Sequence, residues 1–144
     1  MRIHIDNAES YIQAIAACLM KDPASLENWQ CLHMEHAEEA PAHWYEAALG
    51  RAKGLYQDVD CDVVLCADHD MFIITKQRGV YELHSIAAEI KAMGDAKWQW
   101  GETTVYDMFQ DWHGMYELLH AKAGNAPIVD RPRQAPSYYF GEIA

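Results

Sequence analysis

The stretch that decides the fold reads CDVVLCADHDMFIITK and spans residues 61–76. Its two arms, 61–67 and 71–76, are rich in apolar and β-branched residues, which favour strands. The polar turn DHD, at 68–70, separates them. Both arms are apolar on successive residues, which is typical of strands covered on both faces. The stretch therefore predicts a hairpin in the middle of a sheet.

On the carboxyl side of the hairpin, the pattern changes from strand to helix. Apolar residues repeat at helical spacing over 83–93, and Gly94 stands where glycine commonly ends a helix. Residues 98–100 have the pattern of a short strand. From residue 103 to 119, apolar positions predict a long amphipathic helix that ends near Gly124.

On the amino side, residues 2–5 alternate in the manner of a short strand. An apolar stripe over 11–19 predicts a helix, which should end before Pro23 because the residue before proline avoids the helical conformation. Residues 23–56 predict one kinked helix or two, with helical structure restarting at Pro41.

The order of these elements predicts an α+β fold in which helices pack on a small central antiparallel or mixed sheet. A chain of 144 residues has the size of one compact domain. We expect this single domain to span residues 1–124. Residues 125–144, which contain prolines and a glycine, are expected to form an extended or mobile C-terminal tail.

Charge and hydropathy exclude several functional classes. The net charge is −11, and residues 1–70 hold 13 acidic against 4 basic side chains. Such a surface repels phosphate, so we expect no binding to nucleic acid or to an anionic membrane surface. No apolar stretch approaches the roughly 20 residues of a membrane-spanning helix. Because the first residues lack a secretory signal, we expect a cytoplasmic protein.

The polar turn supplies the first candidate binding residues: Asp68, His69 and Asp70, with Asp6 at the end of the first predicted strand. This arrangement is similar to that of receiver domains, which hold Mg²⁺ beside a phosphate-accepting carboxylate. A receiver strand leads into a helix, however, whereas here a second strand follows at once. The simpler interpretation is a hydrophilic hairpin tip.

The same region, residues 63–74, resembles the strand–turn–strand of GGDEF-type nucleotide cyclase domains. In that family a glycine-glycine-acid turn presents groups that bind metal and substrate, and a helix occurs where we predict one at 83–93. The two glycines are replaced here by Ala67 and Asp68 or by Asp68 and His69, depending on the register. The resemblance therefore implies at most a degenerate signalling domain without cyclase activity.

Histidine and carboxylate residues supply candidate metal ligands: His36 and His43 in one segment, Glu117 and His120 in another. Glu-x-x-His spacing on a helix is seen in di-iron carboxylate bundles. Pro41 interrupts the first segment, and a strand-rich centre has no place in a helical bundle. A solvated, charged helix face is the alternative interpretation.

Several aromatic residues fit no helical stripe and are candidate partner contacts. They are Trp98, Trp100, Tyr138, Tyr139 and Phe140. Aromatic side chains bury a large area with little loss of entropy, so they suit contact with a protein partner or self-association through the tail.

The sequence contains no nucleophile elbow, P-loop, dinucleotide-binding glycine pattern or HExxH motif. We therefore expect a small non-catalytic cytoplasmic regulatory or protein-interaction module, acting as a homodimer. One alternative is a receiver-like or degenerate cyclase-like signalling domain that uses Asp6, Asp68 and Asp70, and only this alternative predicts Mg²⁺ as a cofactor. The other is a metal-binding protein with a His/Glu helix face.

Overall fold

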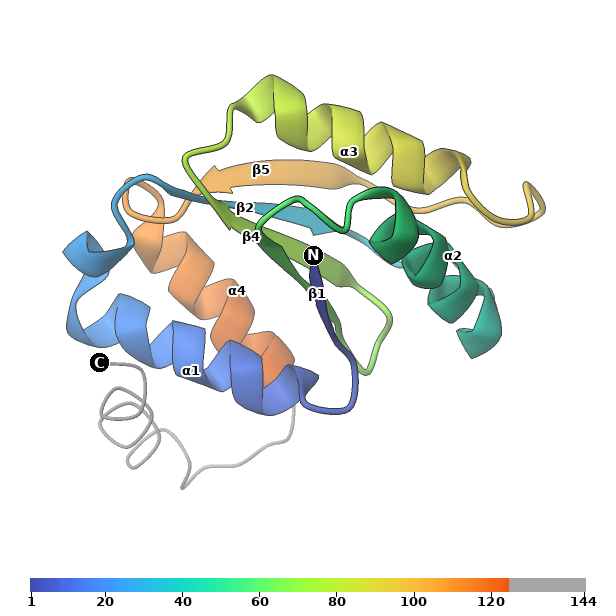
Figure 1. Cartoon of the computed structure of the whole chain (residues 1–144). Helices are drawn as coiled ribbons and strands as arrows, with labels where there is room; N and C mark the ends of the chain where they lie inside the picture. The colour runs from blue at the N-terminus through green and yellow to red at the C-terminus, as the bar shows by residue number, and fades with distance from the viewer. Residues whose placement is uncertain (125–144) are drawn as a thin grey trace.

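The computed structural model describes residues 1–124, in which four α-helices pack on a five-stranded mixed sheet (Figure 1). The strands are β1 (Arg2–His4), β2 (Trp29–Met34), β3 (Cys61–Leu65), β4 (Met71–Lys76) and β5 (Thr103–Asp107). The helices are α1 (Ala8–Lys21), α2 (Ala42–Leu55), α3 (Val80–Ala92) and α4 (Trp112–Gly124), with a short 3-10 helix η1 (Pro23–Leu26). The predicted α+β fold is confirmed.

The sheet has the strand order β1-β3-β4-β2-β5. Strands β3 and β4 form the predicted hairpin, with Val63 opposite Ile73 in an antiparallel ladder. All of β3 is buried, and so is β4 up to Thr75, as expected for strands covered on both faces. Strand β1 pairs with β3 in the parallel direction, which makes the sheet mixed.

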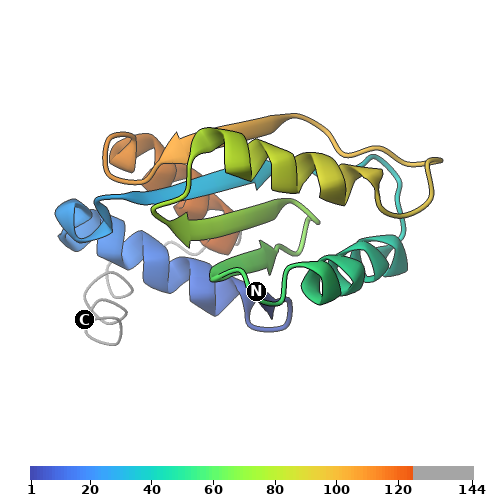
Figure 2. The same ribbon diagram turned by 45° about the horizontal axis from the view of Figure 1, so that its top comes forward.

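Helices cover both faces of the sheet, so the domain has three layers (Figures 1 and 2). On one face, α1 and α4 pack against Val64, Phe72 and Ile74. On the other, α2 and α3 pack against Val63 and Ile73. Successive residues of a strand point to opposite faces of the sheet, which is why neighbours such as Val63 and Val64 contact different helices. None of the helices within the described residues is long and apolar enough to cross a membrane.

The prediction of helix over residues 23–56 is confirmed for its second part, where α2 follows Pro41, and wrong for residues 29–34. Helix η1 ends at Leu26, and residues 29–34 form β2, which lies between β4 and β5 inside the sheet. Apolar residues at a spacing of three gave this segment a helical pattern. Pairing on both edges fixes it as a strand instead, so tertiary context overrides the local preference.

The secondary structure of two further segments differs from the prediction. Residues 98–100 form no strand, and residues 103–107, expected to be helical, form the edge strand β5. Asp107 ends this strand, because its Oδ1 accepts hydrogen bonds from the backbone N–H groups of Phe109 and Gln110. Such a turn separates β5 from α4, which begins only at Trp112.

Candidate functional site

The predicted binding residues Asp6, Asp68, His69 and Asp70 gather at one end of the sheet. Because β1 and β3 are parallel, their carboxyl ends lie at the same end of the sheet. Asp6 follows β1, and the hairpin turn with the other three residues follows β3. In open sheets, ligands commonly bind beside the carboxyl ends of neighbouring strands.

The hairpin turn holds its acidic side chains in fixed positions. The N–H of Cys66 donates to the Asp70 carbonyl, and the N–H of His69 donates to the Cys66 carbonyl, each at 2.9 Å. The Asp68 carboxylate accepts the Asp70 N–H at 3.0 Å. His69 has φ 70°, a left-handed conformation that histidine adopts more readily than most residues. The turn thus orients Asp70 toward the face covered by α1 and α4.

Asp70 is the centre of a buried hydrogen-bond cluster. The residue is 3% exposed. Its Oδ2 accepts from His33 Nε2 at 2.7 Å and from Lys122 Nζ at 2.8 Å. Its Oδ1 accepts from His36 Nδ1 at 2.7 Å and from the His36 backbone N–H at 3.0 Å. Four donors compensate for the desolvation of this carboxylate.

The cluster determines the charges of its members. Burial raises the pKa of Asp70, but hydrogen bonds from His33, Lys122 and His36 outweigh it and hold this pKa far below the usual range. Burial lowers the pKa of Lys122, but the carboxylates of Asp68 and Asp70 raise it above its ordinary value. At neutral pH the cluster therefore contains an ionised carboxylate and an ammonium group.

Lys122 joins the last turn of α4 to the hairpin. Its Nζ contacts both Asp68 Oδ2 and Asp70 Oδ2. The His33 ring, on β2, stacks on Phe72 of β4 with 4.6 Å between ring centroids. The Asp70 carboxylate consequently connects β2, the loop after it, the hairpin turn and α4.

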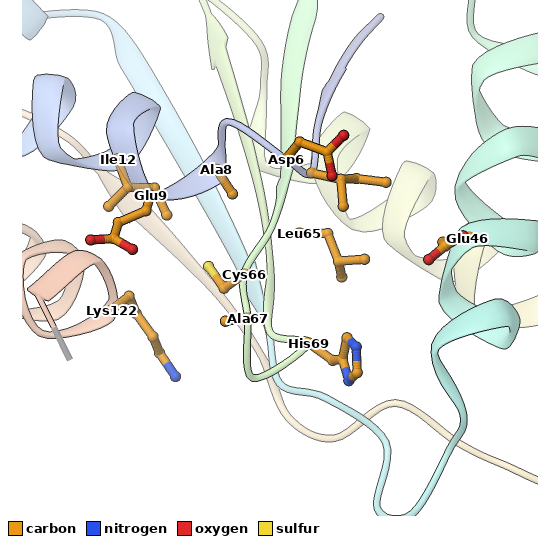
Figure 3. A pocket seen from close by; sticks show the side chains of 11 residues that line it. Asp6, Ala8, Glu9, Ile12, Glu46, Leu65, Cys66, Ala67, His69 and Lys122 are labelled. Atoms are coloured by element: carbon orange, nitrogen blue, oxygen red, sulfur yellow. The ribbon is translucent and has the colours of Figure 1, made fainter. Parts of the chain in front are cut away.

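A pocket of about 260 Å³ opens beside this cluster (Figure 3). Its polar lining comes from five parts of the fold: Asp6, Glu9, Glu46, His69 and Lys122. Its apolar lining consists of Ile5, Ala8, Ile12, Leu65, Cys66 and Ala67. In Figure 3 the α2 carboxylate and the α4 ammonium approach from opposite sides. The pocket therefore combines an apolar surface with charged groups of both signs.

The wall of the pocket formed by His69 is held by α2. The His69 ring stacks on Tyr45, with 4.4 Å between ring centroids and 17° between ring planes. The Tyr45 hydroxyl in turn donates to the Ala37 carbonyl and accepts the Ala37 N–H, each at 2.8 Å. Tyr45 thereby fixes the pocket wall and the loop that carries His36.

The pocket contains no activated thiol. Burial, with the negative charge of Asp68, raises the pKa of Cys66 to about 12. A thiol with such a pKa is protonated at neutral pH, whereas a nucleophilic cysteine is a thiolate. The pocket is thus suited to binding a ligand rather than to attacking one through sulfur.

The four predicted metal ligands are not brought together. His36 contacts Asp70, Glu117 faces His113 at 3.6 Å, and His120 stacks on Tyr116. His43 lies in the first turn of α2, on another part of the fold. Within residues 1–124, no group of three His, Cys, Asp or Glu side chains is arranged to hold a metal ion.

The predicted partner contacts occupy different environments. Trp100 is buried, with its ring 5.4 Å from that of Trp44 and 5.1 Å from that of Tyr45. Trp98 is half-buried, 6.2 Å from the Trp44 ring. Both tryptophans therefore pack on the domain's own core. Tyr138, Tyr139 and Phe140 lie outside the described residues.

Sequence reasoning did not identify His33 and Lys122 as partners of Asp70. A signal for the lysine was present, because Lys122 follows Met115 and Leu119 at helical spacing on the apolar stripe of α4. A cation on a buried stripe requires a carboxylate partner. The histidine gave no such signal, because its orientation depends on β2 being a strand.

A second buried carboxylate, Asp62, lies on β3. Its oxygens accept hydrogen bonds from Arg2 Nε at 2.8 Å and from His4 Nε2 at 2.9 Å, both on the neighbouring strand β1. Arg2 also forms an ion pair with Asp60. These contacts fasten the edge strand β1 to the sheet, on the same face as the Asp70 cluster.

Comparisons of the chain with protein-family models, curated protein sequences and solved structures find no match.

Proposed function

We propose that this protein is a cytoplasmic regulatory module that binds a small ligand in the pocket of Figure 3 and transmits its binding to α4. One observation carries the proposal: Lys122 lines the pocket and also links α4 to Asp68 and Asp70. A cationic ligand in this pocket repels the Lys122 ammonium and thereby alters the contact between α4 and the hairpin. Such a shared residue gives the ligand different contacts in two states, which regulation requires.

The charges of the pocket favour a ligand with a positive group. Asp6 and Glu46 contribute carboxylates from two parts of the fold, whereas the charge of Lys122 is already shared by two other carboxylates. The pocket potential is therefore negative, which attracts cations. Since no three ligating side chains surround a single point in residues 1–124, a small organic amine fits better than a metal ion.

Thermal unfolding with putrescine, a diamine, and separately with Mg²⁺ tests this proposal. We expect putrescine to raise the Tm of the full chain, because a ligand that binds only the folded state stabilises it. The shift should shrink in Glu46→Gln, which removes a pocket carboxylate. It should persist in Glu27→Gln, an exposed position beside the start of β2, at the other end of the sheet.

Two outcomes would contradict the amine-binding module. An equal putrescine shift in both variants would indicate nonspecific attraction to an acidic protein. Stabilisation by Mg²⁺ that is lost in Asp68→Ala, together with Asp68-dependent labelling by acetyl phosphate, would favour the receiver-like alternative.

Contact with a protein partner is a second candidate function, supported by exposed apolar side chains at the start of α3. Tyr81 is 89% exposed and Val80 is 53% exposed. A large exposed aromatic beside an aliphatic residue is a frequent anchor in protein interfaces. We propose a homodimer that uses this patch. Light scattering after size-exclusion chromatography should give a dimer mass that falls to the monomer mass in Tyr81→Ser; a monomeric wild type at micromolar concentration would refute it.

A cytoplasmic location is part of the proposal. The four cysteines, Cys18, Cys31, Cys61 and Cys66, are buried as free thiols. Free buried thiols suit a reducing compartment.

A further inference from the structure

His36 has a ring that is fixed on one side and open on the other. Its Nδ1 contacts Asp70 Oδ1, and this carboxylate is buried. The His36 side chain is nevertheless 48% exposed. Within residues 1–124, the other histidines bonded to a buried carboxylate are His4 and His33, and both have largely buried side chains.

The hydrogen bond to Asp70 selects one tautomer of the His36 ring. An ionised carboxylate only accepts hydrogen bonds, so Nδ1 must carry the proton. The lone pair of the neutral ring is then on Nε2. The backbone N–H of His36 donates to the same carboxylate oxygen, which fixes the residue from a second direction. A buried carboxylate that orients an imidazole in this way is the arrangement found behind general bases.

His36 lines a cleft of about 580 Å³. Its other lining residues are Glu35, Glu38, Lys97, Trp98, Gln99, Trp100 and Gly101. The half-buried Trp98 supplies apolar surface, and the Lys97 ammonium lies 5.1 Å from its ring centroid. The two glutamates make the cleft unfavourable for anions, so an uncharged substrate suits it.

The two walls of this cleft are joined by backbone hydrogen bonds. The N–H of Gly101 donates to the Glu35 carbonyl, and the N–H of Glu35 donates to the Glu102 carbonyl, each at 2.9 Å. A Cβ at position 101 would lie 2.9 Å from the Glu35 Cβ, so only glycine allows this approach. The segment that carries His36 is thus held against the segment that carries Trp98.

We propose that His36 is a general base that hydrolyses small uncharged acyl esters in this cleft, with Asp70 as its positioning residue. Nε2 takes a proton from water as the water oxygen bonds to the acyl carbon. The bond between the acyl carbon and the alcohol oxygen then breaks, and the proton on Nε2 passes to that oxygen. One ester and one water give one carboxylic acid and one alcohol, with no change in oxidation state.

This activity is separate from ligand binding in the pocket of Figure 3, which lies among other residues. The variant that tests it, His36→Gln, changes a side chain that does not line that pocket. Failure of one proposal therefore leaves the other standing.

Hydrolysis of 4-nitrophenyl acetate by the full chain tests the inference. We expect His36→Gln to lower the second-order rate constant by about a hundredfold, the lower end of the range for general-base catalysis. His113→Gln is the matched control, because this exposed histidine faces Glu117, a carboxylate that is itself exposed. The control should retain the wild-type rate and Tm, and His36→Gln should unfold cooperatively at a lower Tm, because Asp70 loses one of its four donors.

Three results would overturn the inference. The first is a wild-type rate equal to that of His36→Gln. The second is an equal loss in His113→Gln, which would mean that any exposed imidazole accounts for the rate. The third comes from long-range ¹⁵N–¹H NMR correlations of the wild type: a proton on Nε2 and a lone pair on Nδ1 would contradict the tautomer on which the mechanism depends.

Discussion

Asp62 and Asp70 are two buried carboxylates on the same face of the sheet. Each needs hydrogen-bond donors to compensate for its desolvation, and the two take these donors from different parts of the fold. Asp62 takes its partners, Arg2 and His4, from the adjacent strand. Asp70 takes its partners from β2, the following loop and α4. The first carboxylate fastens one strand to its neighbour, whereas the second joins elements that are distant in the chain. Burial of a charge therefore says little about its role until its donors are located.

Removal of the Asp70 carboxylate should have the largest effect on stability. In Asp70→Ala the Lys122 ammonium keeps only Asp68, and two histidines lose their acceptor. We expect the free energy of unfolding in urea to fall by about 3–5 kcal/mol, as for a broken buried ion pair. A smaller decrease in the free energy of unfolding than in Asp62→Ala would show that Asp62, not Asp70, contributes more to stability.

Acid should destabilise the protein through both carboxylates, and more through Asp70. The pKa of Asp70 is held far below its ordinary value and that of Asp62 is also lowered, chiefly because hydrogen bonds outweigh burial. The unfolded state then binds more protons, so stability is present above about pH 4 and falls as the pH drops below it. Urea unfolding from pH 7 to pH 3 should show a smaller loss in Asp70→Asn than in wild type; equal losses would contradict this assignment.

Loss of the Asp62 carboxylate should have an intermediate effect. Its partner Arg2 has a side chain that is 57% exposed, so water replaces the carboxylate there in Asp62→Ala, and the largely buried His4 loses its acceptor. We expect a decrease of about 1–2 kcal/mol in the free energy of unfolding, typical of a partly buried hydrogen-bonded pair. Hydrogen exchange should localise the change to β1 and β3. Exchange that spreads through α4 would mean that Asp62 also joins distant elements.

The smallest effect is expected for the ion pair between Arg2 and Asp60. The Asp60 side chain is 84% exposed, and such surface pairs contribute about 0–1 kcal/mol. Asp60→Ala should therefore leave the unfolding midpoint in urea almost unchanged. A clear destabilisation would show that Asp60 and Asp62 hold Arg2 as a unit, which a double variant would detect as non-additivity.

The hairpin was predictable from the sequence because its determinants are local. Consecutive apolar and β-branched residues on both sides of a polar turn favour only one arrangement. Strand β2, with the sequence WQCLHM, lacks such a signal and becomes a strand through its two neighbours. Strand β5 was misassigned because its apolar residues continue into the pattern of α4.

The acidic turn of the site was also predictable because its residues are local in the sequence. Its partners His33 and Lys122 were not. Asp68, His69 and Asp70 are adjacent in the chain. His33 lies 37 residues from Asp70, and Lys122 lies 54 residues from Asp68. Nothing in the local sequence pairs residues so far apart, because their contact depends on how the layers stack.

The link between Lys122 and the hairpin has a consequence for biosynthesis. The ribosome releases the hairpin long before it releases α4, so the growing chain carries an incomplete set of donors around Asp70 until its last described helix has emerged. During that interval the acidic turn lacks Lys122, and the face of the sheet that carries Val64, Phe72 and Ile74 lacks the apolar side chains of α4. Among the described elements, α4 is therefore the one that completes the helical layer it shares with α1.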